Sequence, residues 1–163
     1  MLFETFLHDN NYVFYTIPGY KLVCRNRQTG SRGGVAMYIR DDLNYIIRNN
    51  ISVNIDGKFE SIFVEAHLKT VNCIFGETYR VPNTSEIVSI SYYELEHIQK
   101  DIVLGTNQNF DYLKHKNQAH VFELMDLFLN ASVLLTITKP TRIKHSTATL
   151  IDSIYIKQVK KLN

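Results

Sequence analysis

The sequence predicts an α+β sandwich in which strands dominate and helices pack on the outside. Most of the chain alternates short apolar runs with polar turns, which is the pattern of β-strands, and only two segments have helical spacing. With 163 residues, of which 45% are hydrophobic, the chain is long enough for one core and too short for two comfortable domains. No repeat, low-complexity tract or linker divides it, so we expect a single domain over residues 1–163.

The first half of the chain is predicted to consist of strands separated by turns. The expected strands are Tyr12–Ile17, Tyr20–Cys24, Val35–Ile39, Phe59–Leu68 and Val71–Tyr79. Pro18-Gly19 separates the first two, and a turn rich in glycine and arginine at 28–34 precedes the third. The fourth strand alternates most clearly: Phe59, Ser61, Phe63 and Glu65 share one face, and Glu60, Ile62, Val64 and Ala66 share the other.

The second half is predicted to combine two helices with shorter strands. The first helix is expected over Glu86–Lys100, with Ser85 or Ser89 as its N-cap, and the second over Gln118–Leu129. Further strands are expected at Ile102–Leu104, Leu134–Ile137 and Leu150–Ile156, with a polar loop over Thr138–Thr149. Two helices interleaved with many strands complete the predicted sandwich.

A run of amides follows the predicted strand Ile102–Leu104. Gly105 is expected to turn the chain, and the amides of Asn107, Gln108 and Asn109 come next, with Asp111 beyond them. We expect these amides to be exposed, because a buried unpaired amide costs about 1–3 kcal/mol. Since ligands in α/β folds bind where strands end, the run predicts a functional site. The alternative is an Asn-rich turn that only closes a strand.

Composition restricts the environment more than the function. The net charge of +2 gives no whole-molecule argument for a polyanionic partner, although 18 lysines and arginines allow a local basic surface. Cys24 and Cys73 both lie in strand-like contexts, which favours buried thiols in a reducing compartment. No leader pattern and no apolar run of membrane-spanning length is present, so we expect an intracellular protein without a membrane partner.

Five short segments, taken in order, resemble a known family. They are Glu4–Leu7 (ETFL), Gly33–Arg40 (GGVAMYIR), Tyr79–Asn83 (YRVPN), Leu104–Asn109 (LGTNQN) and, after the loop TKPTR at 138–142, Ala148–Asp152 (ATLID). The series resembles the endonuclease/exonuclease/phosphatase superfamily, and more closely the apurinic-like endonuclease domain of LINE-type (non-LTR) retrotransposons. Each motif alone is weak, but five in the same order across essentially the whole chain make a strong signal.

The resemblance implies a fold and a chemistry. The fold is an α/β four-layer sandwich of two mixed sheets flanked by helices, as in DNase I. The chemistry is hydrolysis of a DNA phosphodiester by an activated water with Mg²⁺ or Mn²⁺ as cofactor. The implied partners are DNA and the reverse transcriptase domain of the parent polyprotein, and the implied location includes the nucleus.

The resemblance also implies roles for individual residues. Glu4 matches the family's metal-binding glutamate and Tyr79 a tyrosine that contacts the scissile phosphate. Asn109 matches an asparagine that orients the water or phosphate, and Asp152 an aspartate that holds the catalytic histidine. Asn107 stands where the family has a catalytic aspartate. The alternatives are a solvated carboxylate for Glu4 and an aromatic residue that caps a strand end for Tyr79.

A second group of residues is expected to bind the substrate. Arg80 and Asn83 would lie on the rim where the nucleic-acid backbone passes, because arginine side chains suit phosphate oxygens. Thr147 matches a threonine near the phosphate in related nucleases. The loop cations Arg32, Arg142 and Lys144 are expected to border a DNA groove, with ordinary solvated surface charges as the alternative.

Departures from the family pattern predict weak or absent catalysis. Asn107 replaces a carboxylate, and an amide accepts no proton at neutral pH and binds cations less strongly. Ser153 replaces the histidine after Asp152, the chain begins at the Glu4 motif, and it ends before the family's terminal Ser-Asp-His segment. We therefore expect an incomplete, degenerate endonuclease domain that is weakly active or inactive and binds its metal weakly. The alternatives are a noncatalytic remnant that binds nucleic acid or protein, and a phosphatase of the same superfamily.

Overall fold

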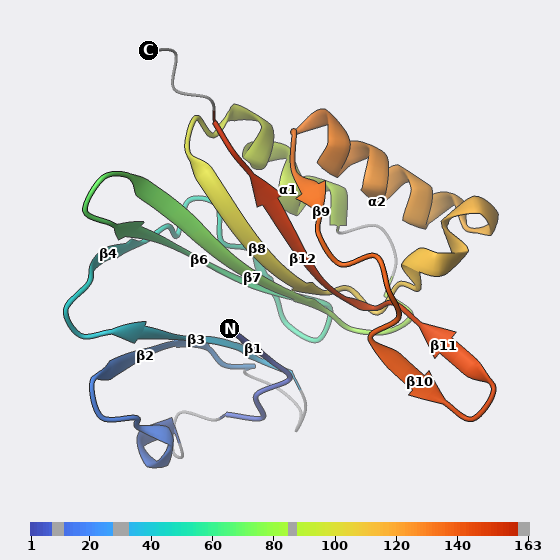
Figure 1. Ribbon diagram of the computed structural model, residues 1–163. Coiled ribbons are helices and arrows are strands. Elements are labelled where there is room, and N and C mark those ends of the chain that lie inside the picture. Colours follow the sequence, from blue (N-terminus) through green and yellow to red (C-terminus); the bar gives the residue numbers. More distant parts are fainter. Residues whose placement is uncertain (8–11, 28–32, 85–87, 160–163) are drawn as a thin grey trace.

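Two β-sheets pack face to face, with two helices on the outer face of the larger sheet (Figure 1). The computed structural model describes residues 1–7, 12–27, 33–84 and 88–159. The predicted sandwich of two sheets with helices outside is confirmed. The larger sheet is mixed, whereas the described strands of the smaller sheet are antiparallel.

The larger sheet has seven strands in the order β4-β6-β7-β8-β12-β9, with β5 also paired to β6. Its strands are β4 (Asn44–Ile47), β5 (Asn54–Ile55), β6 (Phe59–His67), β7 (Asn72–Arg80), β8 (Asp101–Asn107), β9 (Leu134–Leu135) and β12 (Asp152–Lys157). All neighbours are antiparallel except β7 and β8, which are parallel. The parallel pair brings the carboxyl ends of β7 and β8 to the same edge of the sheet.

The smaller sheet has the order β1-β3-β2 and covers one face of β6 and β7. Its strands are β1 (Leu2–Phe3), β2 (Tyr20–Arg25) and β3 (Val35–Arg40). Between the two sheets lies an apolar cluster made by Val23, Val35, Met37, Ile39, Ile62, Val64 and Tyr79. The alternation predicted for β6 is therefore correct, because Ile62 and Val64 face the smaller sheet.

Helices α1 (Val88–His97) and α2 (Ala119–Asn130) cover the opposite face of the larger sheet (Figure 1). Their packing is largely aromatic: the ring centroids of Tyr92 and Phe128 are 4.5 Å apart, and those of Phe128 and Tyr155 are 4.3 Å apart. Phe59 and Phe63 of β6 contribute to the same core. Both faces of β6 are thus buried, which explains why both faces of this strand carry apolar residues.

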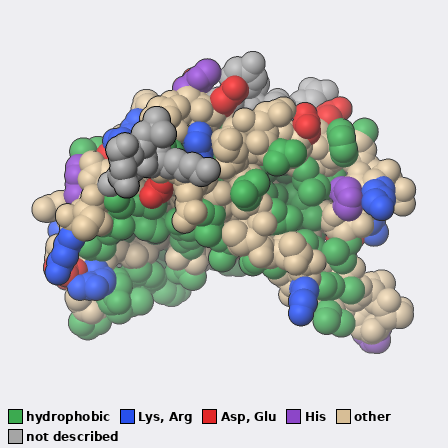
Figure 2. Space-filling model, turned by 45° about the horizontal axis from the view of Figure 1, so that its top comes forward, with side chains coloured by type: hydrophobic (Ala, Val, Ile, Leu, Met, Phe, Trp, Pro, Cys, Tyr) green, Lys and Arg blue, Asp and Glu red, His purple; other side chains and the backbone are tan. Residues whose placement is uncertain are grey.

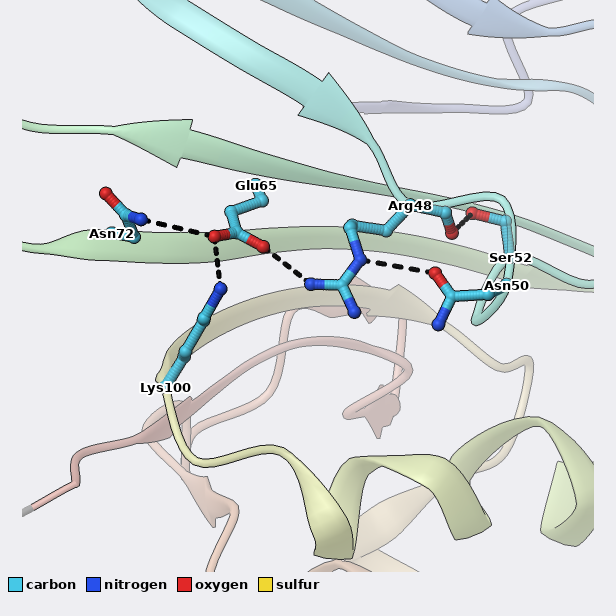
Figure 3. Close-up of polar contacts among 6 residues, drawn as sticks. All are labelled: Arg48, Asn50, Ser52, Glu65, Asn72 and Lys100. Atoms are coloured by element: carbon cyan, nitrogen blue, oxygen red, sulfur yellow. Dashed lines mark hydrogen bonds and ion pairs between the residues drawn. The ribbon is translucent and has the colours of Figure 1, made fainter.

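A polar cluster fixes the edge of the larger sheet far from the carboxyl ends of β7 and β8 (Figure 3). The buried carboxylate of Glu65 accepts hydrogen bonds from Arg48, at 2.5 Å, from Lys100, and from the amide of Asn72 at 3.3 Å. The hydrogen bond from Lys100 is the largest influence and lowers the pKa of Glu65, against the effect of burial. The cluster ties the β4–β5 connection to the chain that follows α1.

Two predicted segments have a different structure. Residues 12–15, predicted as the start of a strand, form a 3-10 helix, η1 (Tyr12–Tyr15), in which Phe14 is 82% exposed. The predicted loop at 138–149 contains a hairpin of β10 (Arg142–Lys144) and β11 (Thr147–Thr149), which projects from the body (Figure 1). Nearly all of its residues are exposed, so no buried face gave it an alternating pattern.

The remaining predicted elements lie close to their expected positions. A second 3-10 helix, η2 (Tyr112–Asn117), begins after Asp111, whose carboxylate accepts the Leu113 and Leu150 N–H groups. The proposed caps of the first helix, Ser85 and Ser89, lie outside the side chains that the structure describes. Within the described ranges, each helix is too short or too polar to cross a membrane.

Candidate functional site

Four neighbouring strands place four polar side chains in one row at the edge where β7 and β8 end. In the strand register, Glu60 of β6 pairs with Tyr79 of β7, Tyr79 pairs with Asn107 of β8, and Asn107 pairs with Asp152 of β12. Residues directly opposite each other on adjacent strands point to the same face of a sheet. The row therefore lies on the face that carries the smaller sheet, and it unites three of the four residues predicted to be catalytic.

Asn107 belongs to the strand and not to a turn after it. β8 continues through Gly105 and Thr106, so the predicted turn at Gly105 and the predicted exposure of the amides are wrong. Asn107 is 3% exposed and Gln108 is fully buried. Gln108 lies on the helix side, where its amide donates to Thr78 Oγ1 at 2.8 Å and to the Tyr92 hydroxyl at 2.7 Å. These hydrogen bonds offset part of the cost of burying the amide, whose Oε1 has no hydrogen-bond partner in the described part of the chain.

The segment around Glu4 joins the row through Tyr79. The Tyr79 hydroxyl donates to Glu4 Oε1 at 2.9 Å, although the two residues are 75 positions apart in sequence. Backbone hydrogen bonds from Thr5 N–H to Gly34 O (3.3 Å) and from Phe6 N–H to Gly33 O (3.0 Å) hold the segment in place. Glu4 is thus a half-buried hydrogen-bond acceptor, which disfavours the alternative of a solvated carboxylate.

Burial controls the protonation of Tyr79. Loss of water contact, and then the hydrogen bond to Glu4 and its negative charge, raise the pKa of Tyr79 to about 12. The guanidinium of Arg27, 6.0 Å from the ring centroid, acts in the opposite direction. Tyr79 is therefore a neutral phenol at physiological pH, and its one O–H hydrogen is donated to Glu4.

Arg80 does not lie on the rim that was predicted for it. It is 4% exposed, and its guanidinium donates to Gln108 O at 2.6 Å and Thr84 O at 2.5 Å, with Phe110 stacked against it at 3.7 Å. Asn109, in the left-handed region at φ 52°, returns a hydrogen bond from its amide to Arg80 O at 2.7 Å. Arg80 and Asn109 stabilise the loops after β7 and β8, because their side chains donate hydrogen bonds to backbone carbonyl groups.

The remaining predicted substrate contacts fall in three different places. Asn83 is exposed in the turn after β7. Arg142, at the base of the hairpin, has its Nε 3.6 Å from Asp152 Oδ2 and so reaches the row. Thr147 lies at the turn of the hairpin, where its hydroxyl donates to Lys144 O at 2.8 Å, and the structure does not bring it to the row. Arg32 lies outside the described residues.

Glu60 and Arg27 are members of the site that the sequence did not reveal. Glu60 is fully buried and accepts hydrogen bonds from Gly34 N–H at 2.6 Å and from Arg27 Nε at 2.5 Å. The available signal was a carboxylate on the otherwise apolar face of β6 formed by Ile62, Val64 and Ala66. Because a buried carboxylate needs partners, that position indicated a cation from elsewhere in the chain.

Few oxygen atoms at and beside the row are of the kind that a hard cation prefers. Within the described ranges there is no group of three His, Cys, Asp or Glu side chains that could hold a metal ion. Glu4 offers a carboxylate, and Asn107 Oδ1 is a buried oxygen without a hydrogen-bond partner in the described part of the chain. Mg²⁺ is commonly held by one or two carboxylates, with waters and substrate phosphates as the other ligands. The metal site centred on Glu4 therefore stays a prediction of the sequence.

Comparisons with known proteins show the fold. No protein-family model and no curated protein matches the chain. Among solved structures, the endonuclease domain of TRAS1, a telomere-specific non-LTR retrotransposon, matches with a TM-score of 0.68 at 14% identity, over 85% of this chain and 65% of that one. D. rerio TDP2, complexed with a single-strand DNA product, matches with a TM-score of 0.62 at 10% identity, over 98% of this chain and 70% of that one.

Phosphatases also occur among the matches. A mannosyl-6-phosphatase of Bacteroides thetaiotaomicron has a TM-score of 0.60 at 14% identity, over 95% of this chain and 69% of that one. Other matches are named as endonuclease/exonuclease/phosphatase proteins. The chain therefore has the fold of this superfamily, and it spans 65% of the length of the TRAS1 domain.

Proposed function

We propose that this chain is a nucleic-acid-binding domain derived from the endonuclease of a non-LTR retrotransposon, with weak or no phosphodiester hydrolysis. The observation that carries the proposal is the row Glu60–Tyr79–Asn107–Asp152, with Glu4 hydrogen-bonded to Tyr79. Tyr79, Asn107 and Asp152 are positions to which the family resemblance assigns catalytic roles, and Glu4 is the metal ligand that it implies, whereas Glu60 is known only from the structure. Under this proposal the reverse transcriptase of the parent polyprotein is the partner domain, and the protein acts in the nucleus.

Binding of a phosphodiester is supported by the donors and cations around the row. Tyr79 lies in the row as a neutral phenol whose O–H donates to Glu4, and a bound phosphate would take over this O–H as its acceptor. Arg142 borders the Asp152 end of the row. The hairpin, which projects from the body beside this edge (Figure 1), also carries the exposed side chain of Lys144. Exposed cations of this kind contact phosphates, and they make affinity depend on salt.

Weak hydrolysis is supported by the amide in the middle of the row. Asn107 lies between Tyr79 and Asp152, where a carboxylate would accept a proton or hold a cation. An amide does neither well at neutral pH. None of the four residues in the row is a histidine, so the described row has no imidazole to act as a base. A bound Mg²⁺ would supply charge neutralisation at the phosphate, with Glu4 as its carboxylate ligand.

The test combines DNA binding with plasmid nicking. We expect a fluorescent oligonucleotide to bind saturably in magnesium buffer, and nicking of supercoiled plasmid to stay at the level of an EDTA control. Asn107→Asp alone should not restore strong nicking, since acid–base groups act as a unit. Robust, EDTA-sensitive nicking that disappears in Tyr79→Phe would show that the chain is a working nuclease.

A phosphatase is the second candidate, favoured by the similarity to the Bacteroides mannosyl-6-phosphatase. Release of inorganic phosphate from sugar phosphates and phosphoinositides, measured beside the nicking assay, separates the two. Phosphate release that requires Tyr79 and Glu4, without oligonucleotide binding, would favour the phosphatase.

A further inference from the structure

Arg27 and Glu60 form a buried ion pair beside Tyr79. The Glu60 side chain is fully buried and that of Arg27 is 11% exposed, with Arg27 Nε 2.5 Å from Glu60 Oε1. The other carboxylate oxygen of Glu60 accepts Gly34 N–H at 2.6 Å. Both oxygens of Glu60 are therefore used, and the carboxylate holds the guanidinium in one orientation.

The guanidinium keeps donors that the protein does not use. Arg27 Nε is bonded to Glu60, while Arg27 Nη2 is buried without a hydrogen-bond partner in the described part of the chain. A buried donor without a partner costs about 1–3 kcal/mol, so such groups are usually matched by water, an ion or a ligand. The guanidinium carbon lies 6.0 Å from the ring centroid of Tyr79. The guanidinium that carries this unpaired Nη2 thus lies beside the ring of Tyr79.

The Gly33-Gly34 turn is shaped around this guanidinium. A Cβ on Gly33 would come within 2.3 Å of Arg27 Nη2, and a Cβ on Gly34 within 2.6 Å of Thr5 Oγ1. Both glycines have positive φ, 110° and 86°. Only glycine allows the turn to lie against Arg27 while it holds the Glu4 segment. The Gly33-Gly34 turn therefore contacts both the guanidinium of Arg27 and the segment that contains Glu4, the proposed metal ligand.

Arg80 and Arg142, the other arginines that the structure describes near the row, are occupied or exposed. The guanidinium of Arg80 is bonded to backbone carbonyls, and that of Arg142 is 53% exposed and faces Asp152. Among the arginines in residues 1–7, 12–27, 33–84 and 88–159, Arg27 combines burial, a fixed orientation and an unpaired Nη2 beside Tyr79. A guanidinium that is held in one orientation and keeps an unpaired Nη2 suits the oxygens of a phosphate, which would reach it by way of the 11% of the side chain that is exposed.

We infer that Arg27 contacts a phosphate of the bound nucleic acid beside Tyr79, and that Glu60 is the residue that positions it. The inference rests on the proposed function for the identity of the ligand, a nucleic-acid phosphodiester. It replaces Arg80 by Arg27 as the phosphate-binding arginine of the site.

The experiment uses two probes on the whole chain. Inorganic phosphate is titrated while the arginine Nε–H signals are followed by NMR, with Arg27 assigned from Arg27→Lys. A fluorescein-labelled oligothymidylate is titrated by anisotropy against wild type, Arg27→Lys and Arg27→Gln. Arg40→Gln is the matched control, because Arg40 lies at the far end of β3 with its exposed side chain paired to Asp42.

We expect phosphate to shift the Arg27 signal saturably, and Arg27→Gln to weaken oligonucleotide binding about tenfold or more, as loss of a charge-assisted hydrogen bond predicts. Arg27→Lys should weaken it less, and Arg40→Gln less than twofold. Because Arg27→Gln leaves Glu60 charged and buried, the double variant Arg27→Gln/Glu60→Gln is measured as well, with thermal melting to confirm folding.

The outcomes separate this inference from the proposed function. Unchanged oligonucleotide affinity in the folded double variant, with no phosphate shift at Arg27, overturns the inference and leaves the function standing. A saturable phosphate shift at Arg27 in a chain that binds no oligonucleotide supports the phosphate site and contradicts the proposed function. Absence of both responses in the folded wild type overturns both.

Discussion

Glu77 and Tyr79 lie two residues apart on the same face of β7, and burial changes the chemistry of both. The side chain of Glu77 is fully buried, and neither of its carboxylate oxygens has a hydrogen-bond partner in the described part of the chain. Burial raises its pKa to about 8. At neutral pH, Glu77 is therefore mainly a neutral acid next to the row, whereas Glu60 on the adjacent strand is held by a cation.

The first prediction concerns the pH dependence that follows from Glu77. The unfolded chain releases this proton near pH 4.5 and the folded chain near pH 8, so the folded state binds more protons between these values. Stability should fall as pH rises through this window, on the order of 5 kcal/mol, and level off above it. Glu77→Gln should remove this loss in urea denaturation at pH 5, 7 and 9. An exposed control, Glu94→Gln, should keep the wild-type slope, and equal slopes in all three proteins would contradict the assignment.

The second prediction concerns the metal. Glu4 is a carboxylate held at the row by Tyr79, so we expect weak Mn²⁺ binding that depends on it. In water-proton relaxation titrations, Glu4→Gln should lower the Mn²⁺ affinity about tenfold or more, the order expected for loss of a charged ligand. Glu123→Gln, an exposed change on α2, serves as the control. Identical titrations of wild type and Glu4→Gln would remove Glu4 from the site.

At the scale of elements, β7 organises the site because it is paired on both sides. It is antiparallel to β6 over nine residues and parallel to β8 over seven, so one strand fixes the registers of two others. Gly76 lies in its middle, where a Cβ would be 2.3 Å from Phe63 and 2.8 Å from Leu104. The side chains of Phe63 from β6 and Leu104 from β8 thus fill the space above Gly76. Their packing sets the distance between β6, β7 and β8 and the helices.

The third prediction tests this packing. Gly76→Ala should destabilise the fold by about 1–3 kcal/mol, because the added methyl group overpacks a filled core. The cost should be smaller in the background of Phe63→Leu, which removes the nearest ring atoms. Urea denaturation of the two single variants and the double variant measures the coupling between the sites. Strictly additive effects would show that Phe63 is not what excludes the side chain.

At the scale of the whole molecule, apolar surface remains exposed on the helix side. Figure 2 shows hydrophobic side chains over broad areas of one face of the molecule. Next to α2 and β9 there is a groove of about 330 Å³ lined mainly by apolar side chains. On its walls Phe122 is 60% exposed, Leu129 61% and Leu134 57%. Contiguous exposed apolar surface of this kind promotes association.

The fourth prediction is that this surface causes self-association. Sedimentation velocity over increasing protein concentration should show association of wild type that is reduced in Phe122→Gln/Leu129→Gln. Because both side chains are largely exposed, their replacement should change stability by about 0.5 kcal/mol or less each. Ile143→Gln, on the exposed hairpin, is the control for removing one apolar side chain elsewhere. A double variant that associates as strongly as wild type would place the interface elsewhere.

The sequence by itself determined the fold class and most strands of the sandwich. Local alternation was sufficient to assign the two faces of β6, and the order of five short motifs was sufficient to indicate the superfamily fold. Periodicity failed at residues 12–15 and in the hairpin, where exposed side chains give no alternating signal. It also placed the end of β8 too early, because Thr106 and Asn107 are polar residues that the tertiary structure buries.

Only the tertiary structure decided how the site is assembled. The row across β6, β7, β8 and β12 depends on strand register, which is set by packing between segments distant in sequence. The contacts Tyr79–Glu4 and Arg27–Glu60 join residues 75 and 33 positions apart, beyond the reach of any local pattern. For the same reason, sequence motifs placed Arg80 at the substrate, whereas the structure buries Arg80 beneath two loops and brings Arg27 beside the ring of Tyr79.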